Sequence, residues 1–346
     1  MRKPFEDVFE DQTKLGTKVQ TDEYHESGAH IIVDQGQEQI AGYTDREEGI
    51  FSTVPAIIFG DHTRIIKFVD EPFFLGADGV KVLRCKLPGA NYRYLYYALR
   101  YAKIPNTGYN RHFKWLKEVQ IAYPDAKRQE EIVSVLDGIS KIIAARQRQL
   151  RALDTLIKAR FVEMFGDPVT NSMNWEKKRF DSLCENLDGR RRPITSTDRI
   201  AGPYPYYGAS GIVDHVADYI FDEDILLISE DGANLLARST PIAFSVRGKV
   251  WVNNHAHVLR FSDLALQKYI EYFFAMISIE DYITGSTQPK LNQAKLNAML
   301  IPVPSKERMD AYHSFIEQVD KSKVVVQAAL DKAQTLFDSL MQQYFG

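Results

Sequence analysis

The chain has 346 residues, of which 45% are hydrophobic and 26% charged, a composition typical of globular protein with room for two domains and connectors. Its formal net charge is −3, so bulk charge does not indicate a nucleic-acid binder, and any basic DNA-binding surface must be local. Two cysteines, no apolar leader and no run of 18 apolar residues argue against a disulfide framework, secretion and membrane spans, and predict a cytoplasmic protein.

The first segment, residues 1–120, is rich in glycine, proline, aromatic and β-branched residues. Short runs at 53–60, 65–69 and 79–84 predict strands separated by turns, and residues 95–101 predict a helix. This mixture is typical of an α+β domain.

A long helix follows the first segment. The stretch from 125 onward is free of proline and nearly free of glycine for about 40 residues, which corresponds to roughly 60 Å of helix. Apolar residues recur every seven positions, which indicates a coiled-coil seam. The seam residues predicted in this helix are Leu136, Ile143, Leu150 and Ile157.

The second half of the chain repeats this layout. Runs at 224–229, 241–246 and 249–253 predict strands, and residues 268–276 predict a helix. Residues 301–346 then align with 121–166 at a constant offset of 180 without a gap, and eleven of the 46 pairs are identical. Such a long period indicates two copies of one architectural unit and approximate two-fold symmetry within the chain. The seam residues predicted in the second helix are Val319, Val326, Leu330, Phe337 and Leu340.

Motifs for chemistry are absent from the sequence. It contains no Pro-Pro, as an adenine-N6 methyltransferase loop would need, no Walker A sequence, no HExxH and no Cys/His cluster. We therefore predict a chain without catalytic residues, metal ligands or a cofactor of its own.

Several short motifs resemble the specificity subunits of type I restriction-modification systems. The helix end LDTLIKARFVEMFGDP at 153–168 and the helix entry at Pro124, Arg128 and Gln129 are similar to that family. So are GSTQPKLN at 285–292, followed by IPVP at 301–304, and the loop GDHT at 60–63.

The resemblance implies an α+β fold: two mixed α/β target-recognition domains separated by two long helices that form an antiparallel coiled coil with internal pseudo-two-fold symmetry. The expected segments are recognition domain 1 at 1–123, spacer helix 1 at 124–167, recognition domain 2 at 168–303 and spacer helix 2 at 304–346. Two long core helices within one large domain are the alternative.

The resemblance also implies a function. Each recognition domain would read one half of a bipartite, gapped site in double-stranded DNA, and the helices would set the gap and recruit two adenine-N6 methyltransferase subunits. Two restriction subunits would complete an endonuclease. S-adenosylmethionine, ATP and Mg²⁺ would belong to these partners. A self-contained DNA-modifying enzyme and a non-reading scaffold or anti-restriction decoy remain as alternatives.

Candidate DNA-binding residues lie in polar, turn-rich stretches, because cations bind phosphates and amide side chains pair with adenine edges. Two of these stretches, after Gly108 and after Gly285, occupy similar places before the two long helices. A solvated surface loop or a buried turn is the structural alternative for each. In the first half the candidates are Asp61, His62, Thr63, Arg64, Asn110, Arg111, His112 and Lys114. In the second half they are Arg190, Arg191, Arg192, Tyr206, Tyr207, Asn253, Asn254, His255, Ser286, Thr287, Gln288 and Lys290.

Overall fold

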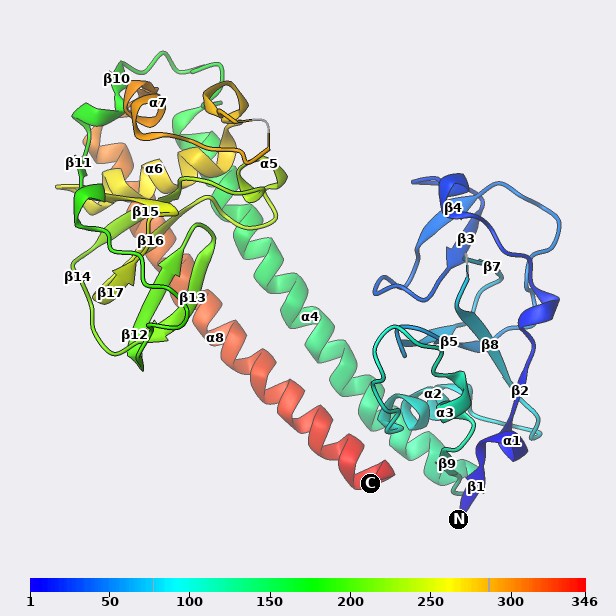
Figure 1. Cartoon of the computed structure of the whole chain (residues 1–346). Helices are drawn as coiled ribbons and strands as arrows, with labels where there is room; N and C mark the ends of the chain where they lie inside the picture. The colour runs from blue at the N-terminus through cyan, green and yellow to red at the C-terminus, as the bar shows by residue number, and fades with distance from the viewer. Residues whose placement is uncertain (77, 286) are drawn as a thin grey trace. The chain divides into compact units, whose positions relative to one another are not determined.

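The computed structural model describes residues 1–76, 78–285 and 287–346 (Figure 1). The chain folds into two compact units: the first contains Met1–Gln147 and Ala328–Gly346, and the second contains Arg148–Gln327. Each long helix therefore contributes one end to each unit. None of the described helices is long and apolar enough to cross a membrane. The division into four segments at the helix ends stays a prediction.

The first unit contains two sheets and one additional strand pair. Its strands are β1 (Arg2–Pro4), β2 (Phe9–Asp11), β3 (His30–Val33), β4 (Gly42–Thr44), β5 (Ala56–Gly60), β6 (Ile66–Val69), β7 (Phe73–Leu75), β8 (Val80–Cys85) and β9 (Gln120–Ala122). The four-stranded sheet has the order β2-β8-β5-β6, the three-stranded sheet has the order β4-β3-β7, and β1 pairs with β9. All residues of β5 are buried, whereas β6, the edge strand of this sheet, alternates between half-buried and buried residues. The strands predicted at 53–60, 65–69 and 79–84 are confirmed.

Short helices complete the first unit. They are α1 (Phe5–Val8), α2 (Tyr92–Tyr101) and α3 (Phe113–Leu116). The backbone N–H of Tyr94 donates to the side chain of Asn91 (3.0 Å), which caps the start of α2. Tyr94, Leu95 and Leu99 of α2 are buried against the core. The helix predicted at 95–101 is therefore confirmed and begins somewhat earlier.

The second unit repeats the strand arrangement of the first and adds one strand, β14. Its strands are β10 (Lys177–Arg179), β11 (Glu185–Asn186), β12 (Ala201–Gly208), β13 (Gly211–Val216), β14 (Phe221–Asp222), β15 (Ile225–Ser229), β16 (Ala243–Val246), β17 (Lys249–Val252), β18 (Ala256–Arg260) and β19 (Leu300–Pro302). The sheet order β11-β18-β15-β16 matches β2-β8-β5-β6, and the β10-β19 pair matches β1-β9. The second sheet, β13-β12-β17-β14, contains the parallel pair β12-β17, as the first unit contains the parallel pair β3-β7. The duplication predicted from the helix repeat thus extends through the sheets.

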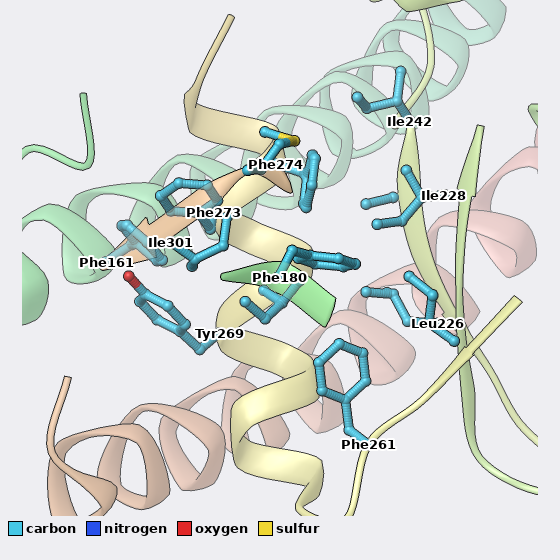
Figure 2. Packing of buried hydrophobic residues seen from close by; sticks show 14 of the residues in the cluster. Phe161, Phe180, Leu226, Ile228, Ile242, Phe261, Tyr269, Phe273, Phe274 and Ile301 are labelled. Carbon is cyan, nitrogen blue, oxygen red and sulfur yellow. The ribbon is translucent and has the colours of Figure 1, made fainter. Parts of the chain in front are cut away.

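Helices of the second unit cover one side of its first sheet (Figure 1). They are α5 (Asn234–Ala237), α6 (Leu264–Met276) and α7 (Gln293–Ala298). Figure 2 shows Phe180 between Tyr269 of α6 and Leu226 of β15, within a cluster that also contains Phe161. All four side chains are fully buried. This cluster joins the sheet, α6 and the long helices in one hydrophobic core.

The two long helices are α4 (Ala126–Phe165) and α8 (Lys306–Phe345), each of 40 residues, as the heptad pattern predicts. In the second unit Phe161, near the end of α4, packs on Tyr312, near the start of α8, with ring centroids 5.7 Å apart. In the first unit Leu136 of α4 and Phe337 of α8 belong to one buried cluster, so the start of α4 packs with the end of α8. The helices therefore pair in antiparallel orientation.

The predicted seam faces inward along both helices. Lys323, seven residues before Leu330 and therefore on the same side of α8, forms an ion pair with Asp154, whose Oδ1 lies 2.6 Å from the lysine Nζ. Five seam residues are buried: Leu136, Ile157, Val319, Val326 and Phe337. Four are half-buried: Ile143, Leu150, Leu330 and Leu340.

Candidate nucleic-acid interface

In the first unit, the residue that follows the central strand β5 anchors the loop before α3. The backbone N–H of His112 donates to the carbonyl oxygen of Asp61 (2.7 Å), and the His112 Nδ1 lies 3.0 Å from the same oxygen. The Asp61 Oδ1 accepts from the backbone N–H of Phe113 (2.7 Å) at the start of α3. Asp61 is 3% exposed and His112 is 0% exposed. Asp61 and His112, which were predicted to contact DNA, are therefore buried residues that hold the loop in position, and their side chains are not exposed to solvent.

Other candidates in the first unit lie at the surface around this anchor. Thr63 donates its hydroxyl to the carbonyl oxygen of Gln35 (2.7 Å), and Arg64, with φ of 62°, donates to the carbonyl oxygen of Ile104 (3.3 Å). Both side chains therefore stabilise loops. The remaining candidates in this unit are His62, which is half-buried, and Asn110, Arg111 and Lys114, which are exposed.

The second unit anchors its equivalent loop in the same way. The backbone N–H of Leu291 donates to the carbonyl oxygen of Glu230 (2.8 Å), as His112 does to Asp61. The backbone N–H of Glu230 donates to the carbonyl oxygen of His255 (2.9 Å), and that of Asp61 to the carbonyl oxygen of Gly79 (2.7 Å). An acidic residue after the central strand therefore ties down the loop before α3 or α7 in both units.

The arginine run 190–192 divides into three different environments. Arg190 pairs with Glu223 (2.8 Å) and lies over the ring of Phe221. Arg191 is 14% exposed and pairs with Glu230 (2.6 Å). Arg192 is exposed, and its side chain has no ion pair or hydrogen bond with the part of the chain that the structure describes. Of the three, Arg192 is the arginine whose guanidinium is available to a phosphate.

A buried network of charges lies beneath the loop before α7. His257, 1% exposed, has its Nδ1 2.6 Å from the Asp188 Oδ2 and its Nε2 2.8 Å from the carbonyl oxygen of Leu291. Glu230 forms ion pairs with both Arg191 and Lys290, and the Lys290 Nζ lies 3.1 Å from the Glu230 Oε1. The network connects the 188–191 turn, the end of β15, β18 and the loop at 289–291.

Burial and ion pairing act in opposite directions on the two carboxylates of this network. Burial by itself raises the pKa of Asp188, but the hydrogen bond and charge of His257 outweigh it and leave that pKa below its ordinary value. Burial likewise raises the pKa of Glu230, and the hydrogen bonds from Arg191 and Lys290 bring it below its ordinary value. Both groups are therefore held as carboxylates.

The ligand atoms of Asp188, Glu230 and His257 lie within 4.8 Å of one another, close enough to hold a metal ion. Arg191 and Lys290 already contact the carboxylates, and their positive charges oppose a cation at the same place. The donor set fits an internal ion network better than a metal centre.

The aromatic and amide candidates of the second unit also separate by burial. Tyr206 is 1% exposed and its hydroxyl accepts from the backbone N–H of Ile194 (3.0 Å), whereas Tyr207 is half-buried. Asn253 is 7% exposed and its Oδ1 accepts from the backbone N–H of His255 (2.8 Å). Tyr206 and Asn253 are therefore buried residues that stabilise the neighbouring backbone. Asn254 and His255, which follow strand β17, are exposed.

The loop before α7 carries the last candidates. Ser286 lies outside the described residues. Thr287 and Gln288 are exposed, and Lys290 pairs through its backbone with Thr284 (2.8 Å in both directions). The backbone pairing and the ion pair of Lys290 with Glu230 fasten this loop at its base.

The network residues Asp188, Glu230 and His257 are not among the functional residues predicted from the sequence. Glu230 directly follows the apolar run at 224–229, and a carboxylate at the end of a buried strand is the signal that the sequence offers. His257 follows His255 at the spacing of one strand face, but His255 is exposed while His257 is buried. The structure separates the two because His257 lies within β18, whereas His255 precedes it.

We expect the second unit to lose stability in acid because the pKa values of Asp188 and Glu230 are lowered on folding. A depressed carboxyl pKa contributes stability above the unfolded-state pKa, and this stability is lost as the pH falls through the folded-state value. The loss therefore begins near pH 4 and continues below the ordinary values of 3.8 and 4.5. Melting temperatures between pH 7 and pH 2.5 measure it, and the Asp188→Asn variant should show a shallower acid slope than the wild type. An equal slope in both would contradict the assignment.

Comparisons with known proteins agree with this architecture. Residues 173–330 match the family described as the type I restriction modification DNA specificity domain. The chain is 33% identical over 129 residues to a putative type I restriction enzyme specificity subunit of Haemophilus influenzae, covering 37% of this chain and 33% of that protein. It is 28% identical over 155 residues to the EcoR124I/EcoR124II specificity subunit of Escherichia coli, covering 41% and 38%. The alignments thus span between a third and two fifths of these relatives' length.

Solved structures extend the likeness to the whole chain at the level of the fold. The S subunit of a type I restriction-modification system from M. genitalium superimposes with a TM-score of 0.61 at 16% identity, covering 100% of this chain and 96% of that one. A chain from a structure of complex assembly and conformational transition in a type I system gives a TM-score of 0.53 at 12% identity, covering 100% and 97%. The resemblance to type I specificity subunits inferred from the sequence motifs is confirmed.

Proposed function

We propose that this chain is the DNA-specificity subunit of a type I restriction-modification complex. Each unit reads one half of a bipartite, gapped double-stranded site, and the chain itself catalyses nothing. The observation that carries the proposal is the duplication: two units of one topology, each with a basic loop tied to the end of its central strand, joined by antiparallel helices of 40 residues. The specificity-domain match at 173–330 supports it.

The geometry of the duplication explains why the target would be gapped and asymmetric. Two readers that share one polypeptide bind two half-sites, and a rigid helical spacer sets the distance between them. The two loops differ in sequence, since the first presents Tyr109 and Arg111 and the second presents Gln288 and Lys290. Different side chains at equivalent positions read different half-sites, unlike the palindrome that a homodimer reads.

The long helices are the proposed docking surface for two adenine-N6 methyltransferase subunits. Both expose apolar residues on their outer faces, whereas a surface helix of an isolated protein normally presents polar residues there. S-adenosylmethionine would be bound by these partners, and ATP and Mg²⁺ by any restriction subunits that join. The exposed apolar residues are Val135, Ile142, Leu156 and Val162 of α4 and Val324, Val325 and Leu336 of α8.

The test of the proposed function is the N6-methyladenine map of the source genome with and without this gene. Loss of methylation at one bipartite, gapped motif is the expected result, and that motif is the target. Turnover of DNA by the purified chain with Mg²⁺ or a methyl donor would favour a self-contained enzyme instead. Binding that depends on salt but shows no preferred site would favour a scaffold or decoy.

Charge placed on the outer face of α8 should prevent docking. We expect the double variant Val324→Asp and Val325→Asp to lose copurification with the methyltransferase, because two carboxylates would be buried in an apolar interface without partners. Val324 and Val325 are 69% and 70% exposed, so the melting temperature should stay within about 2 °C of the wild type. The matched control is Lys332→Asp, an exposed change on the same helix. Retained copurification of the double variant would place the docking surface elsewhere.

Arg192 should contribute to DNA affinity without contributing to stability. We expect Arg192→Ala to weaken binding to all sequences and to lower the salt dependence by about one phosphate contact. Arg191→Ala is the contrasting control: it removes the buried partner of Glu230 and should lower the melting temperature. Salt-dependent binding and thermal unfolding of both variants measure the difference. Equal loss of stability in the two would refute the distinction.

A further inference from the structure

Tyr109 is an exposed aromatic residue in the loop before α3, next to the candidate DNA-binding residues of the first unit. Its side chain is 88% exposed, and its ring stacks on the His62 ring with centroids 4.7 Å apart and an interplanar angle of 10°. A tyrosine normally buries most of its ring on folding, because the ring is a large apolar surface. The structure therefore holds an apolar ring toward solvent in the region where the proposed DNA contacts lie.

The stack has a firm base. The backbone N–H of His62 donates to the Oε1 of Gln35 (3.0 Å), and the Gln35 Nε2 donates to the carbonyl oxygen of Asp78 (3.0 Å). His62 directly follows Asp61, which anchors the loop through His112. The ring that backs Tyr109 is thus held through its own backbone by the Gln35 side chain.

The backbone around Tyr109 forms a tight turn. The N–H of Asn110 donates to the carbonyl oxygen of Gly108 (2.8 Å), and Gly108 has φ of 77°, a region in which a side chain would be strained. The Asn110 side chain donates to the carbonyl oxygen of Thr107, which closes the turn a second time. These bonds place Tyr109 at the tip of the loop.

Charges around the ring suit an approach to DNA. Arg111 is exposed two residues later, and Lys114 is exposed at the start of α3. The carboxylate of Asp78 interacts electrostatically with both Arg111 and His62. Lys18 neutralises it, with its Nζ 2.7 Å from the Asp78 Oδ1. The tip therefore combines an apolar ring with positive charge.

The position of Tyr109 has an equivalent in the second unit, which is occupied by Gln288. His112 and Leu291 make the same backbone bond to the strand end, and the residue three places before each is Tyr109 or Gln288. Gln288 is also exposed. An amide reads the edge of adenine, whereas an aromatic ring offers no such hydrogen-bond pattern and contacts apolar groups. The two units thus present different chemistry from one structural position.

We infer that Tyr109, supported by His62, is the groove-contacting residue of the first unit and that it recognises an apolar group of duplex DNA. The bases of a duplex offer their edges and not their faces, so the contact is with a thymine C5-methyl group or with deoxyribose. This inference rests on the proposed function and adds a residue, a chemistry and a half-site to it.

The experiment measures binding of the full chain, purified with its methyltransferase partner, to duplex DNA that contains the mapped gapped motif. We expect Tyr109→Ala to weaken binding on the order of tenfold, or ~1.4 kcal/mol, and Tyr109→Phe to retain wild-type affinity because the ring remains. The slope of log affinity against log salt should be unchanged in Tyr109→Ala, because no phosphate contact is lost. Arg111→Ala should instead reduce that slope by about one.

Modified DNA distinguishes the two apolar groups. Deoxyuridine replaces each thymine of the first half-site in turn, which removes only the C5-methyl group. If one replacement weakens wild-type binding and has no effect on Tyr109→Ala, the contact is with that methyl group. If every replacement is neutral while Tyr109→Ala still binds weakly, the contact is with deoxyribose.

Two controls distinguish failure of the Tyr109 inference from failure of the proposed DNA-specificity function. Leu15→Ala truncates another exposed apolar residue of the first unit, 65% exposed, and should bind like the wild type. Scrambling the half-site read by the first unit should abolish the difference between the wild type and Tyr109→Ala if the contact is with a thymine methyl group, and should preserve it if the contact is with deoxyribose. If the wild type prefers the motif and Tyr109→Ala binds it equally well, the inference is wrong and the proposed function stands. If the wild type shows no preference for the motif, both are wrong.

Discussion

Replacement of Phe161 by alanine is expected to lower the free energy of unfolding of the second unit by about 3–5 kcal/mol, the usual cost of deleting a buried aromatic ring. Phe161 is 0% exposed. Its ring stacks on Tyr269 of α6 at 5.4 Å and meets the Tyr312 ring of α8 edge-on at 5.7 Å. The deletion leaves a cavity where α4, α6 and α8 meet, and interiors packed in this way collapse only partly around such a space.

Tryptophan fluorescence in denaturant measures this effect. Trp115 lies in the first unit, whereas Trp175 and Trp251 lie in the second, so a Trp115→Phe background reports the second unit alone. The matched control is Leu156→Ala on the same helix, which is 47% exposed and should cost much less. A cost below about 1 kcal/mol for Phe161→Ala would mean that the paired helices do not form part of this core.

Removal of the Asp188 carboxylate should destabilise the second unit by a similar amount, about 3–5 kcal/mol, because it leaves the Arg191 guanidinium and the buried His257 ring without the carboxylate that they contact. The side chains of Asp188, His257 and Arg191 are 8%, 1% and 14% exposed. Asp188 also accepts from the backbone N–H of Val258 (2.8 Å), so the Asp188→Ala variant loses a hydrogen bond to β18 as well. DNA binding by the second unit should fall with it, since His257 joins this network to the loop before α7.

An exposed ion pair provides the control for Asp188→Ala. Asp224 pairs with Arg247 at 2.6 Å, but the arginine side chain is 78% exposed, and such pairs contribute about 0–1 kcal/mol. Asp224→Ala should therefore leave the unfolding midpoint almost unchanged. Treatment with EDTA tests the alternative of a metal centre, which predicts a lower melting temperature for the chelated wild type, whereas the ion network predicts no change. Asp188→Ala with wild-type stability would contradict the network.

Local and periodic features of this chain are predictable from its sequence. The seven-residue spacing of Leu136, Ile143 and Leu150 specifies a long helix with one apolar face, because side chains at that spacing lie on one side of a helix. The gapless repeat at an offset of 180 residues is enough to indicate the duplicated architecture, since a period of that length means two copies of one unit. Apolar runs such as 225–228, within the strand predicted at 224–229, predict the central strands because a strand buried on both faces is continuously apolar.

Only the tertiary structure shows which of the polar candidate residues are buried in contacts within the protein and which are exposed to solvent. Arg191 and Arg192 are neighbours of one type in an irregular stretch, yet one is bound in a network and the other is exposed. Irregular backbone has no periodicity from which burial follows, and the partner that buries a side chain lies far away in sequence, as Asp188 and His257 do across 69 residues. The sequence alone therefore determined the two-fold helical frame, whereas three-dimensional packing determined which polar side chains support the proposed interface and which are free to contact DNA.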